Sequence, residues 1–161
     1  MNAFAPDTRP ALPRDPRRFG IGLIGFGGIA EYAHVPAYRK AGFRLAAVAS
    51  RSAASLVRAR ALCGPELVHD NWRTLLELPA VDIADVTVPF DEDRLVIVAE
   101  AAARGKHILM QKPLAHSRAA AREMVRLAET AGVKLAVNQN ARWCPAYRGA
   151  RLMPTEAIRH E

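Results

Sequence analysis

The sequence predicts an α/β protein whose strands form a doubly wound, mostly parallel sheet of the Rossmann-like type. Apolar segments alternate along the chain with segments of helical periodicity, which is typical of parallel strands joined by helical crossovers. A glycine-rich turn follows the first apolar run, in residues 19–30, which read FGIGLIGFGGIA. With 161 residues, of which 50% are hydrophobic, the chain has the length and composition of one domain with one core.

The glycine-rich turn is the first indication of function. Gly25, Gly27 and Ala30 are spaced as in a strand that turns sharply into a helix over the pyrophosphate of a dinucleotide. Gly25 permits the turn, Gly27 leaves room for phosphate oxygens, and Ala30 lets the helix pack closely on the strand. The free N–H groups that begin the helix would face the anion, although a simple glycine turn is the alternative. The candidate cofactor contacts here are Gly25, Phe26, Gly27, Gly28, Ile29 and Ala30.

Six segments are predicted to be strands, and several are nearly all apolar, as buried parallel strands should be. They are Gly20–Gly25, Arg44–Ala49, Glu66–His69, Ile83–Val88, His107–Met110 and Lys134–Asn138. We expect Pro36 to kink or interrupt the first helix after Tyr32 to His34, since proline lacks an amide hydrogen.

The clearest helix is predicted from about Ser117 to Ala131 and ends at Gly132. Its spacing predicts one buried and one exposed face. The buried face carries Ala121, Met124, Val125 and Ala128, and the exposed face carries Arg118, Arg122, Arg126 and Glu129.

Composition and charge exclude several classes of protein. Arg, Asp or Pro interrupts the longest apolar stretches, so we expect a soluble protein without a membrane partner. The net charge of +7 would suit a nucleic-acid binder, but the arginines are scattered and no aromatic residues lie between them to stack on bases. Cys63 and Cys144 lack the spacing of a metal site and indicate reduced thiols in the cytoplasm. Residues 1–18 hold four prolines and four arginines and are predicted to form a flexible tail.

The end of the second predicted strand bears on the choice of dinucleotide. It reads Val48, Ala49, Ser50, Arg51, Ser52, without a carboxylate to hold the ribose hydroxyls of NAD. Arg51 can offer a charged planar fork to a 2′-phosphate, and Ser50 can offer a hydroxyl. This favours NADP over NAD as the cofactor. The alternative is that Ser50 caps the next helix and that Arg51 is only solvated.

Four segments together resemble a known family. GFGGIAEYAHVPAY, VASRS, ARGKHILMQKPLA and VNQNARWCP are similar in order and spacing to the amino-terminal domain of the glucose-fructose oxidoreductase and inositol dehydrogenase family, Gfo/Idh/MocA. The resemblance covers about residues 18–150. Its most specific motif is Gly105, Lys106, His107 followed by Gln111, Lys112, Pro113.

The resemblance implies roles for several residues. It puts Lys112 at the end of the fifth strand, beside the nicotinamide ribose and the reacting oxygen of the substrate, where an ammonium can stabilise developing charge. Lys112 is therefore the candidate catalytic residue, and Gln111 stands where the family commonly has Glu. Val88 and Pro89 partly match a turn that contacts the cofactor. Asn140 and Arg142 match a segment that helps line the active site.

Other polar residues near these motifs are given structural roles. Asp91 to Asp93 replace residues that are usual in the family at this turn, and we expect them to begin a helix rather than bind a metal. His34 and His107 match frequent family positions, and we expect His34 to pack near the cofactor loop and His107 to support the fifth strand.

The resemblance also implies an activity and a missing part. It implies NAD(P)-dependent hydride transfer on a sugar, polyol or related hydroxy or keto substrate. Residues 19–142 would form the dinucleotide-binding domain, and residues 143–161 the truncated start of the connection to an absent substrate domain. We expect little activity from the chain alone, and self-association or a separately encoded substrate domain as partner. A nonenzymatic dinucleotide-binding module and a truncated remnant remain alternatives.

Overall fold

A computed structural model of the chain describes residues 13–89 and 91–152. Residues 14–138 form one compact unit, and residues 139–152 belong to a second unit that is described by itself. Most of the predicted tail, residues 1–12, and the last part of the predicted connection, residues 153–161, lie outside the described residues. Within the predicted tail, Asp15 caps a short 3-10 helix, η1 (Pro16–Arg18).

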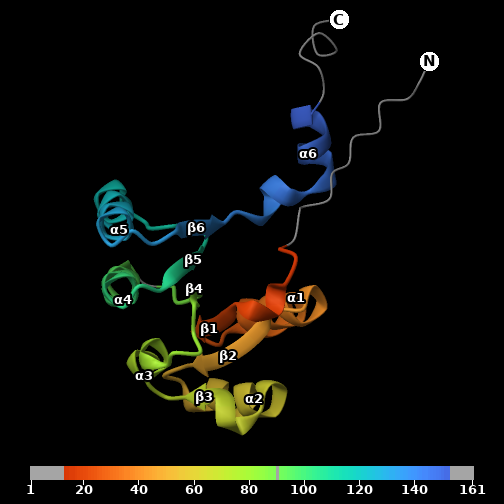
Figure 1. Ribbon diagram of the computed structural model, residues 1–161, viewed down its shortest axis with the longest axis vertical. Coiled ribbons are helices and arrows are strands. Elements are labelled where there is room, and N and C mark those ends of the chain that lie inside the picture. The colour runs from red at the N-terminus through yellow and green to blue at the C-terminus, as the bar shows by residue number, and fades with distance from the viewer. Residues whose placement is uncertain (1–12, 90, 153–161) are drawn as a thin grey trace, which may run out of the picture. The chain divides into compact units, whose positions relative to one another are not determined.

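The larger unit is built on a sheet of six parallel strands in the order β3-β2-β1-β4-β5-β6 (Figure 1). The strands are β1 (Gly20–Ile24), β2 (Arg44–Ala49), β3 (Val68–His69), β4 (Ile83–Val86), β5 (His107–Gln111) and β6 (Leu135–Asn138). Strand order runs outward from β1 in one direction and outward from β4 in the other. The predicted doubly wound sheet is therefore confirmed. In such a sheet, ligands bind beyond the carboxyl ends of the strands where the order reverses, here between β1 and β4.

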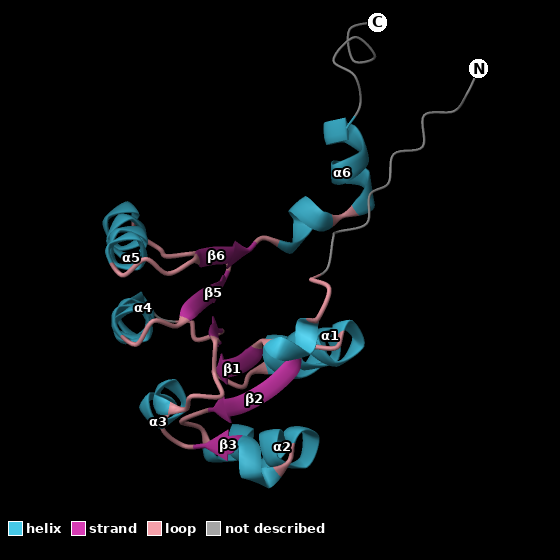
Figure 2. Cartoon of the chain, viewed as in Figure 1, coloured by secondary structure: helices cyan, strands magenta, loops and turns pink. Residues whose placement is uncertain are grey.

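Helices cover both faces of the sheet (Figure 2). They are η2 (Ala30–His34), α1 (Val35–Ala41), α2 (Ala53–Cys63), η3 (Pro65–Leu67), α3 (Trp72–Glu77), α4 (Asp91–Ala103) and α5 (Arg118–Thr130). Neighbouring residues of a strand point to opposite faces. Leu23 accordingly packs in a core with Ala30, Val35 and Ala59 from η2, α1 and α2. Ile24 belongs to a larger core on the other face, formed with α3, α4 and α5.

The six predicted strands are all present, but most of their bounds differ by one or two residues. β1 ends at Ile24 because Gly25 has a φ of +96°, outside the extended region. β3 keeps only the last two predicted residues, since the residues before it form η3. β4 stops at Val86 instead of Val88, β5 continues to Gln111, and β6 begins at Leu135.

The prediction that Pro36 kinks or interrupts the first helix is met only by a change of hydrogen-bond pattern, because residues 28–41 are helical throughout. η2 is a π-helical turn in which the Val35 N–H bonds to the Ala30 carbonyl, and a regular α-helix begins only at Val35. Pro36 is the second residue of α1 and directly follows the π-helical turn, so the change of pattern falls where a backbone N–H is missing.

Helix α5 has the predicted ends but not the whole predicted face. Ser117 accepts a hydrogen bond from the Ala120 N–H as its N-cap, and Gly132 follows with a φ of +68°. Met124 and Ala128 are buried, whereas Val125 is 39% exposed. The assignment of Val125 to the buried face was wrong. Leu127 packs against the core instead. The buried face is centred on Met124 and Ala128 and extends to the side of the helix that lies away from Val125.

Candidate functional site at the carboxyl edge of the sheet

The glycine-rich turn closes tightly over the end of β1. The Gly25 N–H donates to the Ala49 carbonyl at 2.8 Å, which joins the turn to the end of β2. A Cβ at Gly25 would lie 2.8 Å from Oγ1 of Thr87, so both the positive φ and the space demand glycine here. Thr87 Oγ1 in turn donates to the Gly25 carbonyl at 2.9 Å. The turn is thus held from both neighbouring strands.

Gly27 differs from Gly25, because a Cβ at Gly27 would meet no atom within 4 Å. Packing inside the described part of the protein therefore gives no reason for glycine at this position. Open space above a turn that starts a helix is what an approaching phosphate group requires. Among the other residues of the turn, Phe26 and Ala30 are buried and Ile29 is exposed. The Phe26 side chain therefore packs in the core.

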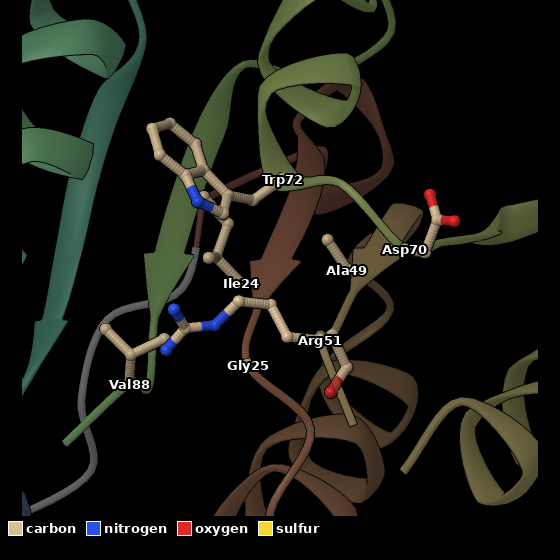
Figure 3. Close-up of a pocket in the computed structure, with 8 residues that line it drawn as sticks. Ile24, Gly25, Ala49, Arg51, Asp70, Trp72 and Val88 are labelled. Carbon is tan, nitrogen blue, oxygen red and sulfur yellow. The ribbon is translucent and has the colours of Figure 1, made fainter. Parts of the chain in front are cut away.

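A pocket beside the turn collects residues from four strand ends (Figure 3). It is lined by Ile24, Gly25, Ala49, Ser50, Arg51, Asp70, Trp72 and Val88. Four predicted cofactor contacts, Gly25, Ser50, Arg51 and Val88, are thereby brought together, and Pro89 follows Val88 as an exposed residue. No motif in the sequence indicated Asp70 and Trp72 as residues of this pocket. Their position directly after the β3 strand could have indicated them, since the ends of parallel strands share one edge.

Arg51 and Ser50, which line this pocket, have specific hydrogen-bond partners. Nη2 of Arg51 bonds to Oδ2 of Asp93 at 2.7 Å, so the alternative of a merely solvated Arg51 was incomplete. The N-cap of α2 is Ser52, whose hydroxyl accepts from the Ser55 N–H, and Ser50 instead accepts from the Ser52 N–H. Asp93 lies in the first turn of α4, where the acidic residues were expected to begin a helix.

The end of β5 carries Gln111 and Lys112. Lys112 is exposed, and its backbone N–H donates to Oε1 of Gln111 at 2.8 Å. The Gln111 Nε2 in turn donates to Nε2 of His34 at 3.2 Å, and Nδ2 of Asn138 donates to the same atom at 3.1 Å. Gln111 is therefore fixed between a buried histidine and the backbone of the candidate catalytic lysine. The peptide between Lys112 and Pro113 is cis.

Behind Gln111 lies a buried polar network. Two N–H donors meet Nε2 of His34, which makes that atom an acceptor and puts the proton of the neutral ring on Nδ1. Nδ1 lies 2.6 Å from Oδ2 of Asp85, which also accepts from the Tyr38 hydroxyl at 2.7 Å. Burial, and then the charge of Asp85 and its hydrogen bond, raise the pKa of Tyr38 far above its usual value. Tyr38 therefore stays a donor. His34 is buried in the helical turn that follows the glycine-rich turn, near the loop where it was expected, and Asp85 and Tyr38 are the partners that sequence reasoning missed.

Arg94 connects the turns after β4 and β5. It is buried on α4, and its Nε donates to the Val88 carbonyl at 2.6 Å. Its Nη1 donates to the carbonyls of Pro113 and Leu114. One guanidinium thus ties the pocket-lining turn at Val88 to the turn that follows Lys112. No sequence motif indicated this role.

Asn140 and Arg142 belong to the second unit. Both lie in the 3-10 helix η4 (Asn140–Trp143), which precedes α6 (Pro145–Leu152). The guanidinium carbons of Arg142 and Arg148 lie 5.4 and 5.3 Å from the centre of the Trp143 ring. The contact of Asn140 and Arg142 with a cofactor stays a prediction.

The remaining candidates for chemistry are few in the described residues. Cys63 and Cys144 are free thiols, and burial raises the pKa of Cys63 more than Arg39 lowers it, so Cys63 is a poor nucleophile at neutral pH. His, Cys, Asp and Glu side chains do not gather there in groups of three or more that could hold a metal ion. Across residues 13–89 and 91–152, every helix is too short or too polar to cross a membrane.

Comparison with curated proteins finds sugar dehydrogenases and reductases among the relatives. The chain is 33% identical over 131 residues to the D-apiose dehydrogenase of Paraburkholderia graminis, and the match covers 81% of this chain and 34% of that protein. It is 35% identical over 133 residues to the 1,5-anhydro-D-fructose reductase of Ensifer adhaerens, with 81% and 39% covered. The chain therefore spans a third to two fifths of the length of these two relatives.

Solved structures share the fold of the larger unit. An NAD-binding oxidoreductase from Klebsiella pneumoniae superposes with a TM-score of 0.72 and 37% identity, over 81% of this chain and 36% of that one. A 3-ketoreductase from Actinomadura kijaniata in complex with TDP-benzene and NADP superposes with a TM-score of 0.66 and 30% identity. That match covers 74% of this chain and 38% of that one. An oxidoreductase from Agrobacterium radiobacter in complex with NAD+, L-tartaric acid and magnesium superposes with a TM-score of 0.72 and 28% identity. That match covers 78% of this chain and 36% of that one.

The profile of one oxidoreductase family matches most of the chain. The matched residues, 19–139, contain the whole sheet, the glycine-rich turn, the pocket and Lys112. The geometry and the match agree that a pyridine dinucleotide is the ligand of this edge. The chain belongs to the Gfo/Idh/MocA oxidoreductase family and carries its NAD(P)-binding Rossmann domain.

Proposed function

We propose that residues 19–142 bind NADP in preference to NAD and form the nucleotide-binding half of a dehydrogenase that acts on a sugar, a polyol or a related hydroxy or keto compound. The observation that carries the cofactor proposal is that Gly25 and Arg51 line one pocket at the point where the strand order reverses. No carboxylate follows β2 directly to hold a ribose 2′-hydroxyl, whereas Arg51 can bind a 2′-phosphate.

The residues present suit the parts of such a cofactor. The turn from Gly25 to Ala30 would hold the pyrophosphate, because Gly27 leaves open space and a helix begins there. Ser50 and Arg51 would hold the adenosine ribose and its phosphate, in the pocket shared with Trp72. Val88, Pro89 and Gln111 would complete this part of the cofactor site, and Asn140 and Arg142 are proposed as further cofactor contacts.

Lys112 is the proposed catalytic residue. When bound, the nicotinamide supplies or accepts the hydride. The Lys112 ammonium is exposed, so it can reach a substrate, orient its hydroxyl or carbonyl and stabilise negative charge on that oxygen. Gln111 fixes the Lys112 backbone through its hydrogen bond at 2.8 Å. The Lys112 side chain thus extends from a fixed backbone at the end of β5.

The substrate class rests on the relatives. Two of them are named for D-apiose and for 1,5-anhydro-D-fructose, and a structural neighbour is a 3-ketoreductase. These names support a carbohydrate or carbohydrate-like substrate for the whole protein.

We propose a cytoplasmic location because Cys63 and Cys144 are free thiols. The exposed rings of Trp143 and Tyr147 support an interaction surface, for self-association or for a substrate domain.

Titration of the 161-residue chain with NADPH and NADH tests the proposal. A charge-assisted bond between Arg51 and a phosphate should make NADPH bind about tenfold more tightly, and Arg51→Ala should remove most of that difference. Tighter binding of NADH would contradict the choice of cofactor. Turnover of sugar or keto substrates would support an enzyme if Lys112→Ala abolishes it. Cofactor binding without turnover would support a nonenzymatic module. A chain that does neither would be a remnant.

A further inference from the structure

We propose that Asp93 is a specificity-determining residue that competes with the 2′-phosphate of NADP for Arg51 and so limits the preference of the site for NADP. The inference rests on the proposed function, since it concerns the same cofactor site. Its basis is the ion pair between Nη2 of Arg51 and Oδ2 of Asp93, at 2.7 Å. The two residues follow different strands and are 42 positions apart in the sequence.

The ion pair lies at the mouth of the cofactor pocket. Arg51 extends across the end of β1 toward Val88, over the pocket that Gly25 also lines (Figure 3). Asp93 lines an adjoining depression, which shares Arg51, Asp70 and Trp72 with that pocket. A ligand that enters beside Gly25 and reaches Arg51 therefore comes close to the Asp93 carboxylate.

The ion pair between Arg51 and Asp93 should affect the binding of NADP and NAD differently. A phosphate on the ribose needs the N–H groups of the guanidinium, some of which Asp93 already occupies, and it meets the like charge of the Asp93 carboxylate. A ribose hydroxyl carries no charge, so NAD can bind without breaking the ion pair. The other cation of the depression, Arg73, bonds to Glu100 at 2.8 Å. Asp93 should therefore lower the affinity for NADP and leave that for NAD unchanged.

The expected effect is modest because the ion pair is exposed. The side chain of Arg51 is 68% exposed and that of Asp93 is 35% exposed. Ion pairs in such surroundings are weak, so removal of Asp93 should strengthen binding of the phosphate-bearing ligand about two- to fivefold. The gain should shrink as salt is added, because salt screens the charges involved.

The test uses two fragments that occupy only the adenosine part of the site. Adenosine 2′,5′-bisphosphate and AMP differ by the 2′-phosphate alone, and calorimetry gives the ratio of their dissociation constants. The variants are Asp93→Asn, Asp93→Ser, Arg51→Ala and the double variant Asp93→Asn with Arg51→Ala. Glu123→Gln is the matched control, since Glu123 forms an exposed ion pair with Arg126 on α5 at 2.6 Å and its loss changes the net charge equally. Thermal unfolding of each variant checks that it is folded.

We expect both Asp93 variants to raise the preference for the bisphosphate about two- to fivefold, with no change for AMP or in Glu123→Gln. The gain should vanish in the Arg51→Ala background. Equal gains for both fragments, a gain that persists without Arg51, or no gain would overturn the role of Asp93 while leaving dinucleotide binding intact. A chain that binds neither fragment nor NADPH would overturn the proposed function as well, so the two failures are distinguishable.

Discussion

Nδ1 of His34 lies 2.6 Å from Oδ2 of Asp85, and the two side chains are 6% and 0% exposed. This pair joins the π-helical turn that follows the glycine-rich turn to the middle of β4. Through Gln111 and Asn138 it also reaches the carboxyl ends of β5 and β6. The helical turn that follows the glycine-rich turn and the end of β5 that precedes Lys112 are therefore attached to one buried polar network.

Removal of His34 should destabilise the domain. Oδ1 of Asp85 has no hydrogen-bond partner among the described residues, so the carboxylate depends on the partners of Oδ2. His34→Leu would leave a buried charge with only Tyr38 as donor and should cost about 3–5 kcal/mol of unfolding free energy. The double variant His34→Leu with Asp85→Leu should recover part of that loss, because both polar partners are gone. Urea unfolding measures both values, and a double variant no more stable than His34→Leu would contradict this account.

Tyr38 should make the domain lose stability in alkali. Its pKa is raised in the folded state, mainly by burial, whereas in the unfolded chain it is near 10. Above about pH 10 the unfolded state therefore loses a proton that the folded state retains, and the free energy of unfolding falls. Between pH 8 and 11, wild type should lose stability more steeply than Tyr38→Phe. Urea unfolding at each pH gives the two stability curves, and identical pH slopes for the two proteins would refute the prediction.

Gly25→Ala and Gly27→Ala should separate folding from ligand binding. At Gly25 the positive φ and a Cβ only 2.8 Å from Thr87 Oγ1 should lower the free energy of unfolding by about 1–3 kcal/mol. At Gly27 a Cβ meets nothing within 4 Å, so stability should change by less than about 0.5 kcal/mol. Gly27→Ala should nonetheless weaken NADPH binding, because the methyl group would occupy space needed by the pyrophosphate. Unchanged affinity in Gly27→Ala would argue against the phosphate site.

Arg94 should be needed for stability and for the position of Lys112. Arg94→Met would leave the carbonyls of Val88, Pro113 and Leu114 without their buried donor, at a cost of about 2–4 kcal/mol. Arg94→Lys should recover little, since an ammonium cannot span carbonyls on two separate turns as a planar fork does. Arg122→Met, on the exposed side of α5, is the control and should stay within about 0.5 kcal/mol of wild type. Chemical denaturation gives the free energy of unfolding of the three variants, and an Arg94→Met variant as stable as Arg122→Met would contradict this role of Arg94.

Local features of the fold could be predicted from the sequence because they depend on neighbouring residues. The positive φ at Gly25, the N-cap at Ser117 and the change of helix type beside Pro36 each follow from the chemistry of one residue and its nearest neighbours. Runs of apolar residues located all six strands, although packing with neighbouring elements decided where each one ends. The exposure of Val125 shows the limit of periodicity, because the helix can rotate by part of a turn to fit the core.

The contacts that shape the site could not be predicted from sequence alone. Arg51 meets Asp93, 42 residues later, and His34 meets Asn138 after 104 residues. The sequence by itself determined a parallel sheet, a glycine-rich turn and a lysine at the end of a strand. Only the tertiary structure decided that Arg51 is paired with an acid and that Gln111 rests on a buried histidine. The physical reason is that parallel crossovers bring distant strand ends to one edge, where side-chain partners are chosen by packing in three dimensions.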